Sequence, residues 1–205
     1  TEIYTLSLHD ALPISVLLAL GAPLAVALGI TGTVVILVEG LGIMSVPTNT
    51  YTGIAKYPLL ALPVFVLAGM IFERAGVALR LVKFASALVG PRRGGLGVVA
   101  VLVCMVLGGI SGSGPADAAA VAMVMIPSMV KQGYPKAFSA SLIAAAGATA
   151  ILIPPSIAFI VYGVLVPGAS VPALFAAGIV PGLLASLALI IPTLIFARRH
   201  GFGAD

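Results

Sequence analysis

The stretch ISGSGPADAAAVAM, from Ile110 to Met123, sets glycines, serines, a proline and an aspartate between two strongly apolar flanks. Hydrocarbon cannot satisfy the hydrogen-bonding groups of irregular backbone. A break of this kind at membrane depth is therefore tolerated only where it is buried in protein or lines a water-filled cavity. The stretch thus predicts a binding cavity around its Gly-Ser-Gly-Pro centre.

The composition indicates an all-helical integral membrane protein. Of 205 residues, 61% are hydrophobic and 8% are charged, whereas a soluble domain carries roughly a quarter charged residues. The mean hydropathy is +1.25. The ten Lys and Arg residues are scattered among apolar segments rather than gathered into a stripe with aromatic residues, so a nucleic-acid partner has no support. We expect a multi-pass protein of the lipid bilayer.

Hydropathy separates apolar segments that are expected to be helices. They cover about residues 15–22, 24–38, 58–72, 95–110, 115–130, 137–165 and 172–197. Gly21 to Pro23 divides the first two as a tight turn or kink. The more polar region 39–57 is expected to be an aqueous or interfacial connection. Glu73 to Val89 places apolar residues at helical spacing among basic ones, which predicts an amphipathic helix at the membrane interface.

Basic residues predict which side of the membrane the loops face. The positive-inside rule places three groups of basic residues in the cytoplasm. They are Arg74, Arg80, Lys83, Arg92 and Arg93 before the Ile110 region, Lys131 and Lys136 after it, and Arg198 and Arg199 at the end of the last segment. Among the basic residues, only Lys56 is left outside. The intervening arms of about 16 residues would span about 24 Å as helix, less than the roughly 30 Å hydrocarbon core. We therefore predict one re-entrant helical hairpin with its tip at Ser111 to Pro115.

The segment from Ala137 to Leu165 is interrupted by Ile153-Pro154-Pro155-Ser156. Two successive prolines remove two amide donors and push the preceding residue out of helical geometry, which predicts one discontinuous helix. Two interrupted membrane elements in succession are typical of secondary transporters, where half-helix ends and unwound carbonyls hold substrate and ions.

Candidate ion-binding residues lie at these two interruptions. We expect Na⁺ to be bound by the hydroxyls of Ser111, Ser113 and Ser156 and by nearby backbone carbonyls, since hard cations need oxygen ligands without requiring a formal charge. The flexible-turn alternative assigns the glycines to packing alone. The full predicted ion-binding set is Ser111, Gly112, Ser113, Gly114, Pro154, Pro155 and Ser156.

Asp117 lies just beyond the predicted tip and is the only acid between Glu73 and Asp205. One interpretation is a helix cap, because a carboxylate at a helix N-terminus is favoured by the dipole and satisfies free amides. The other is a part in ion or proton coupling, since acids inside membranes are usually functional.

An intramembrane protease is a further alternative, because Gly109-Ile110-Ser111-Gly112 matches the serine motif of rhomboid-type enzymes. Such a serine needs a base, normally a histidine. The only histidines are His9 and His200, near the two ends of the chain, so we expect no enzymatic activity. No phosphate-binding loop is present either. A non-transporting membrane interaction module is the remaining alternative.

Residues 1–14, TEIYTLSLHDALPI, differ in composition from the rest of the chain. They are polar and lack a basic start or a small-residue cleavage site, unlike a signal peptide, and they resemble translated sequencing-adaptor read-through. We predict that 1–14 is a non-native leader and that 15–205 is a membrane transport domain.

Several ordered motifs resemble the large membrane subunit of TRAP transporters, the DctM-like permeases. The motifs are Arg93-Gly94-Gly95-Leu96, Ile110-Ser111-Gly112-Ser113, Ile126-Pro127-Ser128-Met129, Ile153-Pro154-Pro155-Ser156 with Val161-Tyr162-Gly163, and Ala177-Gly178-Ile179-Val180-Pro181-Gly182. The resemblance runs from about residue 16 to residue 200. It implies a Na⁺-driven importer of organic acids, of the C4-dicarboxylate, keto acid or sialic acid class, in the bacterial inner membrane.

The resemblance also implies partners and a mechanism. The partners would be a small four-helix membrane subunit and a periplasmic solute-binding protein, Na⁺ would be the coupling ion with no other cofactor, and the movement would be of the elevator type. Ser111 to Gly114 would form the tip of the first hairpin, and Pro154 to Ser156 would complete the first Na⁺ site. The family chain is longer and has a second, inverted repeat. This chain would therefore hold the truncated N-terminal repeat and half of a substrate site, for which we expect Ser113, Pro115 and Ser156.

Overall fold

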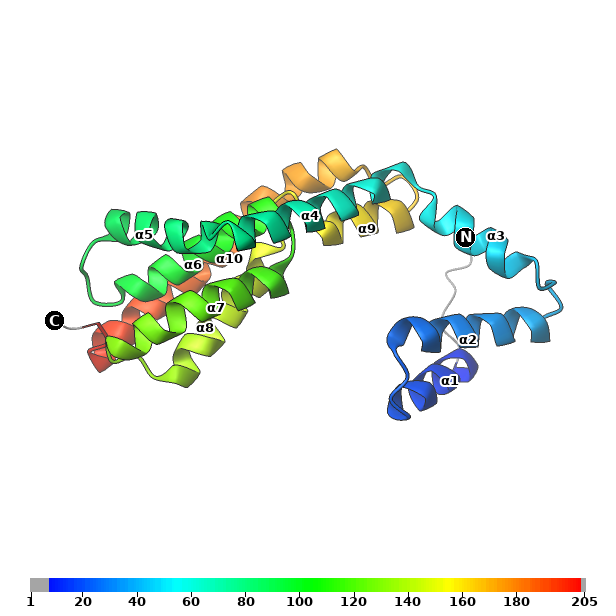
Figure 1. Ribbon diagram of the computed structural model, residues 1–205, viewed down its shortest axis with the longest axis horizontal. Coiled ribbons are helices and arrows are strands. Elements are labelled where there is room, and N and C mark those ends of the chain that lie inside the picture. Colours follow the sequence, from blue (N-terminus) through cyan, green and yellow to red (C-terminus); the bar gives the residue numbers. More distant parts are fainter. Residues whose placement is uncertain (1–7, 204–205) are drawn as a thin grey trace. The chain divides into compact units, whose positions relative to one another are not determined.

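The computed structural model describes residues 8–203 of the chain, with side chains from Ala11 onward. Within residues 8–203 the regular structure is helical and no strand occurs, which confirms the all-helical prediction. The chain divides into two compact units, with the boundary between Lys56 and Tyr57 (Figure 1).

The first unit contains α1 (Leu8–Ala19), α2 (Leu24–Val38) and α3 (Ser45–Ile54). α1 packs against α2, and Gly21 to Pro23 separates them as predicted. The predicted connection over residues 39–57 contains a helix, α3, none of whose residues is buried. Its threonines turn their hydroxyls back to carbonyls one turn earlier, as Thr48 does to Met44 O at 2.8 Å, so these polar side chains are satisfied on a helix.

Residues 1–7 of the predicted leader lie outside the described residues. Residues 8–14 form the first part of α1. The assignment of 1–14 as a leader and of 15–205 as a transport domain stays a prediction.

The second unit is a helical bundle centred on α6. Its elements are η1 (Tyr57–Leu60), α4 (Ala61–Arg74), α5 (Val77–Val89), α6 (Gly95–Ser111), α7 (Gly114–Lys131), α8 (Lys136–Ala150), α9 (Ile157–Leu165) and α10 (Val171–His200). α6 packs against α5, α7, α8 and α10. It is apolar on all sides, as a helix at the centre of a bundle has to be, and Val99, Val103 and Cys104 on it are buried.

The two predicted interruptions are present. α6 and α7 form a helical hairpin whose turn is Gly112-Ser113, and the long segment after Lys136 is broken between α8 and α9 at residues 151–156. Gly112 has φ of 66°, a left-handed conformation that favours glycine because it has no Cβ. The two interruptions predicted from glycine and proline are therefore confirmed as features of the backbone.

The predicted amphipathic helix begins later than Glu73. Glu73 and Arg74 are the last residues of α4, and Gly76, at φ of 69°, separates α4 from α5. A left-handed residue ends a helix, so the predicted start is wrong. The apolar residues of α5 lie on two sides of the helix: Val77 and Leu81 pack on the core, while Phe84 and Leu88 are 64% and 70% exposed.

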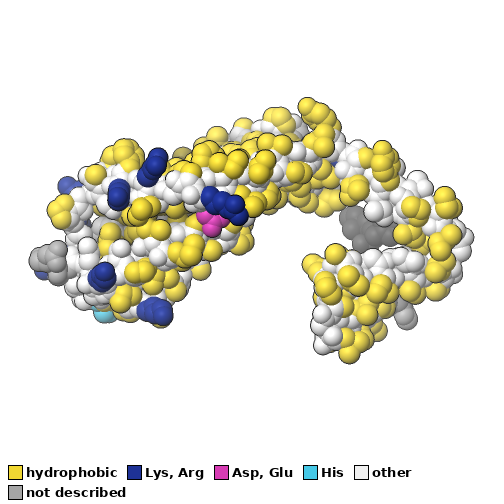
Figure 2. All heavy atoms as spheres, viewed as in Figure 1, with side chains coloured by type: hydrophobic (Ala, Val, Ile, Leu, Met, Phe, Trp, Pro, Cys, Tyr) yellow, Lys and Arg dark blue, Asp and Glu magenta, His cyan; other side chains and the backbone are white. Residues whose placement is uncertain are grey.

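Exposed apolar side chains cover much of the second unit. No residue of α4 is buried, and large aliphatic side chains on α10 such as Val180 and Leu184 are also exposed. Figure 2 shows apolar side chains over much of the visible surface. Among the described residues, Tyr57–Arg74 and Val171–His200 are long and apolar enough to cross a bilayer. A surface of this kind fits contact with lipid or with other membrane helices.

Small residues let the hairpin and α8 approach closely. A Cβ at Gly108 on α6 would lie 2.6 Å from the Cβ of Ala150, and a Cβ at Gly147 on α8 would lie 2.6 Å from the Cβ of Ala118 and 2.9 Å from the carbonyl oxygen of Gly114. In membranes such close backbone contact is a main source of helix association. The glycines therefore hold the hairpin against α8.

We expect Gly147→Ala to lower the stability of the second unit by about 1 to 3 kcal/mol, because the added methyl group overpacks the α7–α8 contact. Gly29→Ala on α2 is the matched control, since a Cβ there meets nothing within 4 Å. Thermal unfolding of both variants in detergent measures the difference. Equal melting temperatures in the two variants would show that the contact is not tight.

Candidate functional site

The tip of the hairpin is a two-residue turn between helix ends. α6 ends at Ser111, and Gly112 N–H donates to Gly108 O at 2.9 Å. α7 begins at Gly114, with Ser113 at the cap position and Pro115 in the first turn. Proline is well placed there, because the first amides of a helix have no partner within it. The turn thus reverses the direction of the chain and leaves few backbone amides without a hydrogen-bond partner.

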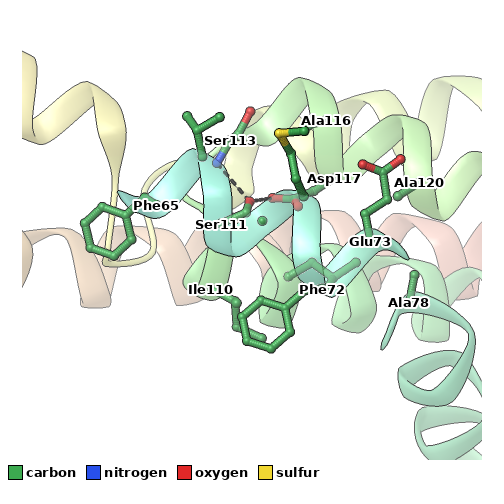
Figure 3. Close-up of a pocket in the computed structure, with 14 residues that line it drawn as sticks. Phe65, Phe72, Glu73, Ala78, Ile110, Ser111, Ser113, Ala116, Asp117 and Ala120 are labelled. Carbon is green, nitrogen blue, oxygen red and sulfur yellow. Dashed lines mark hydrogen bonds between the residues drawn. The ribbon is translucent and has the colours of Figure 1, made fainter. Parts of the chain in front are cut away.

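A buried hydrogen-bond chain joins the two arms at the tip (Figure 3). The hydroxyl of Ser111 donates to Asp117 Oδ2 at 2.6 Å, and the Ser113 amide donates to Ser111 Oγ at 3.0 Å. The side chains of Ser111 and Asp117 are each only 6% exposed. A hydrogen bond to a carboxylate is stronger than one between neutral groups. This bond therefore ties the end of α6 to the first turn of α7.

The break between α8 and α9 ends at Ser156, which is fully buried. Ser156 is the cap residue of α9, and its Oγ accepts a hydrogen bond from Phe159 N at 3.4 Å. Pro154 and Pro155 precede it and are half-buried. A serine cap satisfies one of the free amides at a helix start. The hydroxyl of Ser156 is thus inside the bundle, at the start of a half-helix.

The hairpin tip and the helix break lie against each other. Ile157 N–H donates to Gly112 O at 3.5 Å, and a Cβ at Gly112 would lie 2.9 Å from the carbonyl oxygen of Pro155. On the other side of the break, a Cβ at Gly182 of α10 would lie 2.8 Å from Ile153 Cγ1. The break is therefore held between the tip and α10, and its Pro155 carbonyl oxygen packs against the Gly112 backbone of the tip.

A pocket of about 110 Å³ lies between the hairpin and α4 (Figure 3). Of the predicted site residues, Ser111, Ser113 and Asp117 line it. The others do not line this pocket: Gly112, Gly114, Pro115, Pro154, Pro155 and Ser156. The structure thus brings Gly112 to the helix break, and places Ser111, Ser113 and Asp117 on the pocket that faces α4.

Sequence reasoning missed two residues of α4 that line the same pocket. Glu73 adds a second carboxylate to it, and a Cβ at Gly69 would lie 3.2 Å from the Cβ of Ser111. The signal was available, because residues four apart share a face of a helix. The acid and the glycine together mark the face that α4 turns to the hairpin.

The histidine that a serine protease would need is not near Ser111. His200 Nδ1 lies 3.0 Å from Phe196 O, and its ring stacks on Phe196 at the C-terminal end of α10. The part of α10 that touches the helix break is at Gly182, roughly 27 Å away along the helix. The side chain of His9 lies outside the described part. The described geometry gives no support to a protease.

Comparison with known proteins identifies the family. Residues 12–205 match the family model for the tripartite ATP-independent periplasmic transporter, DctM component. The chain is 40% identical over 200 residues to the C4-dicarboxylate TRAP transporter large permease protein DctM of Rhodobacter capsulatus, which covers 91% of this chain and 46% of that protein.

Two further relatives carry other substrate names. The chain is 40% identical over 202 residues to the isethionate TRAP transporter permease protein DctMQ of Oleidesulfovibrio alaskensis, covering 96% of this chain and 32% of that protein. It is 40% identical over 175 residues to the 2,3-diketo-L-gulonate TRAP transporter large permease protein of Escherichia coli, covering 85% of this chain and 41% of that protein.

The chain spans between a third and a half of the length of these relatives. The match nevertheless covers nearly all of this chain, and it includes the hairpin tip and the helix break that the structure brings together. The resemblance seen in the sequence motifs is thereby confirmed, and the chain belongs to the DctM family, the large permease component of tripartite ATP-independent periplasmic transporters.

Proposed function

We propose that this chain is the N-terminal repeat of a large permease subunit that imports an organic acid together with Na⁺. The substrates named for its relatives are a C4-dicarboxylate, isethionate and 2,3-diketo-L-gulonate, which share an anionic head on a small polar body. The substrate belongs to the C4-dicarboxylate, keto acid or sialic acid class of organic acids. Membership of a tripartite system supports two partners, a small membrane subunit and a periplasmic solute-binding protein. The chain itself lies in the bacterial inner membrane.

The observation that carries this proposal is the contact between the hairpin tip and the helix break. Secondary transporters bind ions where half-helix ends and unwound carbonyls meet near the bilayer midplane. Here Gly112 O accepts a hydrogen bond from Ile157 N–H, and the Gly112 backbone packs on the carbonyl oxygen of Pro155. Na⁺ is bound at this contact by backbone carbonyls and by the hydroxyls of Ser113 and Ser156. Ser111 adds its remaining lone pair, and Ser113, Pro115 and Ser156 form the adjoining half of the substrate site.

The α6–α7 hairpin is re-entrant in this proposal. Its arms have 17 and 18 residues, so they extend about 25 Å and 27 Å, less than the roughly 30 Å hydrocarbon core. Arg92 and Arg93 precede the hairpin and Lys131 ends it, which favours the same cytoplasmic side for both ends. The hairpin and α8 move together as one body in an elevator-type movement, supported by the continuous packing of α6 with α7 and α8.

The topology is tested by cysteine labelling in a Cys104→Ala background. We expect Arg92→Cys and Lys131→Cys to react with a membrane-impermeant maleimide only after the cytoplasmic side is opened, because a re-entrant hairpin returns to the side from which it enters. Lys56→Cys is the control and is expected to react from outside. Labelling of either hairpin position from outside in intact cells would contradict the re-entrant arrangement.

The ion site is tested by uptake of the cognate acid against Na⁺ concentration, with the assembled transporter in proteoliposomes. We expect Ser113→Ala and Ser156→Ala each to raise the half-saturating Na⁺ concentration roughly five- to a hundred-fold, since losing one ligand costs about 1 to 3 kcal/mol. Ser141→Ala is the control, because that exposed hydroxyl bonds only Phe138 O on its own helix.

Membrane insertion and melting temperature are measured in parallel, because Ser156 also caps α9. A half-saturating Na⁺ concentration equal to that of Ser141→Ala in both variants would overturn the ion site.

A further inference from the structure

We propose that Asp117 is a positioning residue of the ion site: it holds the hairpin tip in its binding geometry through Ser111, without touching the ion. The proposal rests on the proposed function, because it concerns the same tip. It differs from both interpretations of Asp117 based on the sequence, a helix cap and a coupling acid. The carboxylate accepts a hydrogen bond from the opposite arm of the hairpin, from Ser111 Oγ at 2.6 Å.

The Ser111 hydroxyl links three points of the tip. It has one hydrogen and two lone pairs; the hydrogen is donated to Asp117, and one lone pair accepts the Ser113 amide at 3.0 Å. Asp117 therefore sets the direction of the Ser111 hydroxyl, and that hydroxyl sets the position of the Ser113 amide. Gly112 lies between the two serines and presents its carbonyl oxygen to the helix break.

The surroundings make this link stiff. Ser111 and Asp117 are each 6% exposed, so water competes little for the hydrogen bond, and electrostatic attraction is strong in the low-dielectric interior. Gly69 of α4 packs on Ser111, where a Cβ would lie 3.2 Å from the serine Cβ. Removing the carboxylate would leave a buried hydroxyl without its acceptor, which favours a rearrangement of the tip.

Glu73 allows the hydrogen bond to be separated from the charge. It lines the same pocket as Asp117, and its carboxylate comes from α4 rather than from the hairpin (Figure 3). Replacing Glu73 removes an equal charge from the pocket and leaves the Ser111–Asp117 bond in place. A change in the half-saturating Na⁺ concentration that follows replacement of Asp117 but not of Glu73 is therefore caused by loss of the Ser111–Asp117 bond.

The experiment measures the half-saturating Na⁺ concentration, the substrate KM and the maximal rate of the assembled transporter in proteoliposomes. The variants are Asp117→Ala, Asp117→Asn, Ser111→Ala, the Asp117→Ala/Ser111→Ala double variant and the control Glu73→Gln. We expect Asp117→Ala to raise the half-saturating Na⁺ concentration about tenfold, which is the loss of one buried hydrogen bond to a charged group. Ser111→Ala should raise it at least as much, because that variant also loses the proposed ion ligand. The Asn oxygen still accepts from Ser111, so Asp117→Asn should stay near the wild-type value.

The double variant carries the decisive comparison. Residues that act through one hydrogen bond are not additive. Because Asp117 acts only through Ser111, we expect Asp117→Ala/Ser111→Ala to match Ser111→Ala. Two outcomes would overturn the positioning role: multiplied effects in the double variant, or a shift in Glu73→Gln as large as in Asp117→Ala. If Asp117→Ala does not fold, Asp117→Asn and Ser111→Ala still test the positioning role. A half-saturating Na⁺ concentration raised as much in Asp117→Asn as in Ser111→Ala would contradict it.

Ser113→Ala and Ser156→Ala, measured alongside, separate the two proposals. If they leave the half-saturating Na⁺ concentration unchanged, the ion site itself is wrong. If they and Ser111→Ala raise it while Asp117→Ala does not, the ion site stands and the positioning role of Asp117 is refuted.

Discussion

The second unit depends on the close approach of two irregular backbone segments, the hairpin turn at Gly112 and the helix break that ends at Ser156. The approach is possible because glycine occupies the contact, where a Cβ at Gly112 would lie 2.9 Å from the carbonyl oxygen of Pro155. Gly108 on α6 and Gly147 on α8 allow the same close backbone approach farther along these helices. Where lipid replaces water, helices gain little from apolar burial, so contact of this kind has to hold them together.

The same contact solves a hydrogen-bonding problem. Irregular backbone inside a membrane needs partners from the protein, because lipid offers none. Ile157 N–H at the break finds Gly112 O at the tip, and Phe159 N–H finds the hydroxyl of Ser156. Each interruption thus supplies part of what the other lacks. The carbonyl oxygens that remain near the contact are the groups that a cation can use.

Several features could be predicted from local chemistry. The hairpin turn and the helix break follow from residues that act on their own backbone, since glycine permits a left-handed turn and proline removes an amide donor. The end of α4 was misplaced, because Gly76 was not recognised as the left-handed residue that ends it. α3 was missed because its polar residues suggested a connection, although their hydroxyls bond within the helix.

The sequence by itself determined that the chain is helical and apolar, where its helices are interrupted, and which family its motifs resemble. These depend on composition and on rules that operate within one or two helical turns. Only the tertiary structure decided that Ser111 faces Asp117, that Glu73 shares their pocket, and that Gly112 meets the helix break. Such pairings depend on how helices rotate and cross when their surfaces interlock, and spacing along one helix does not specify its partner.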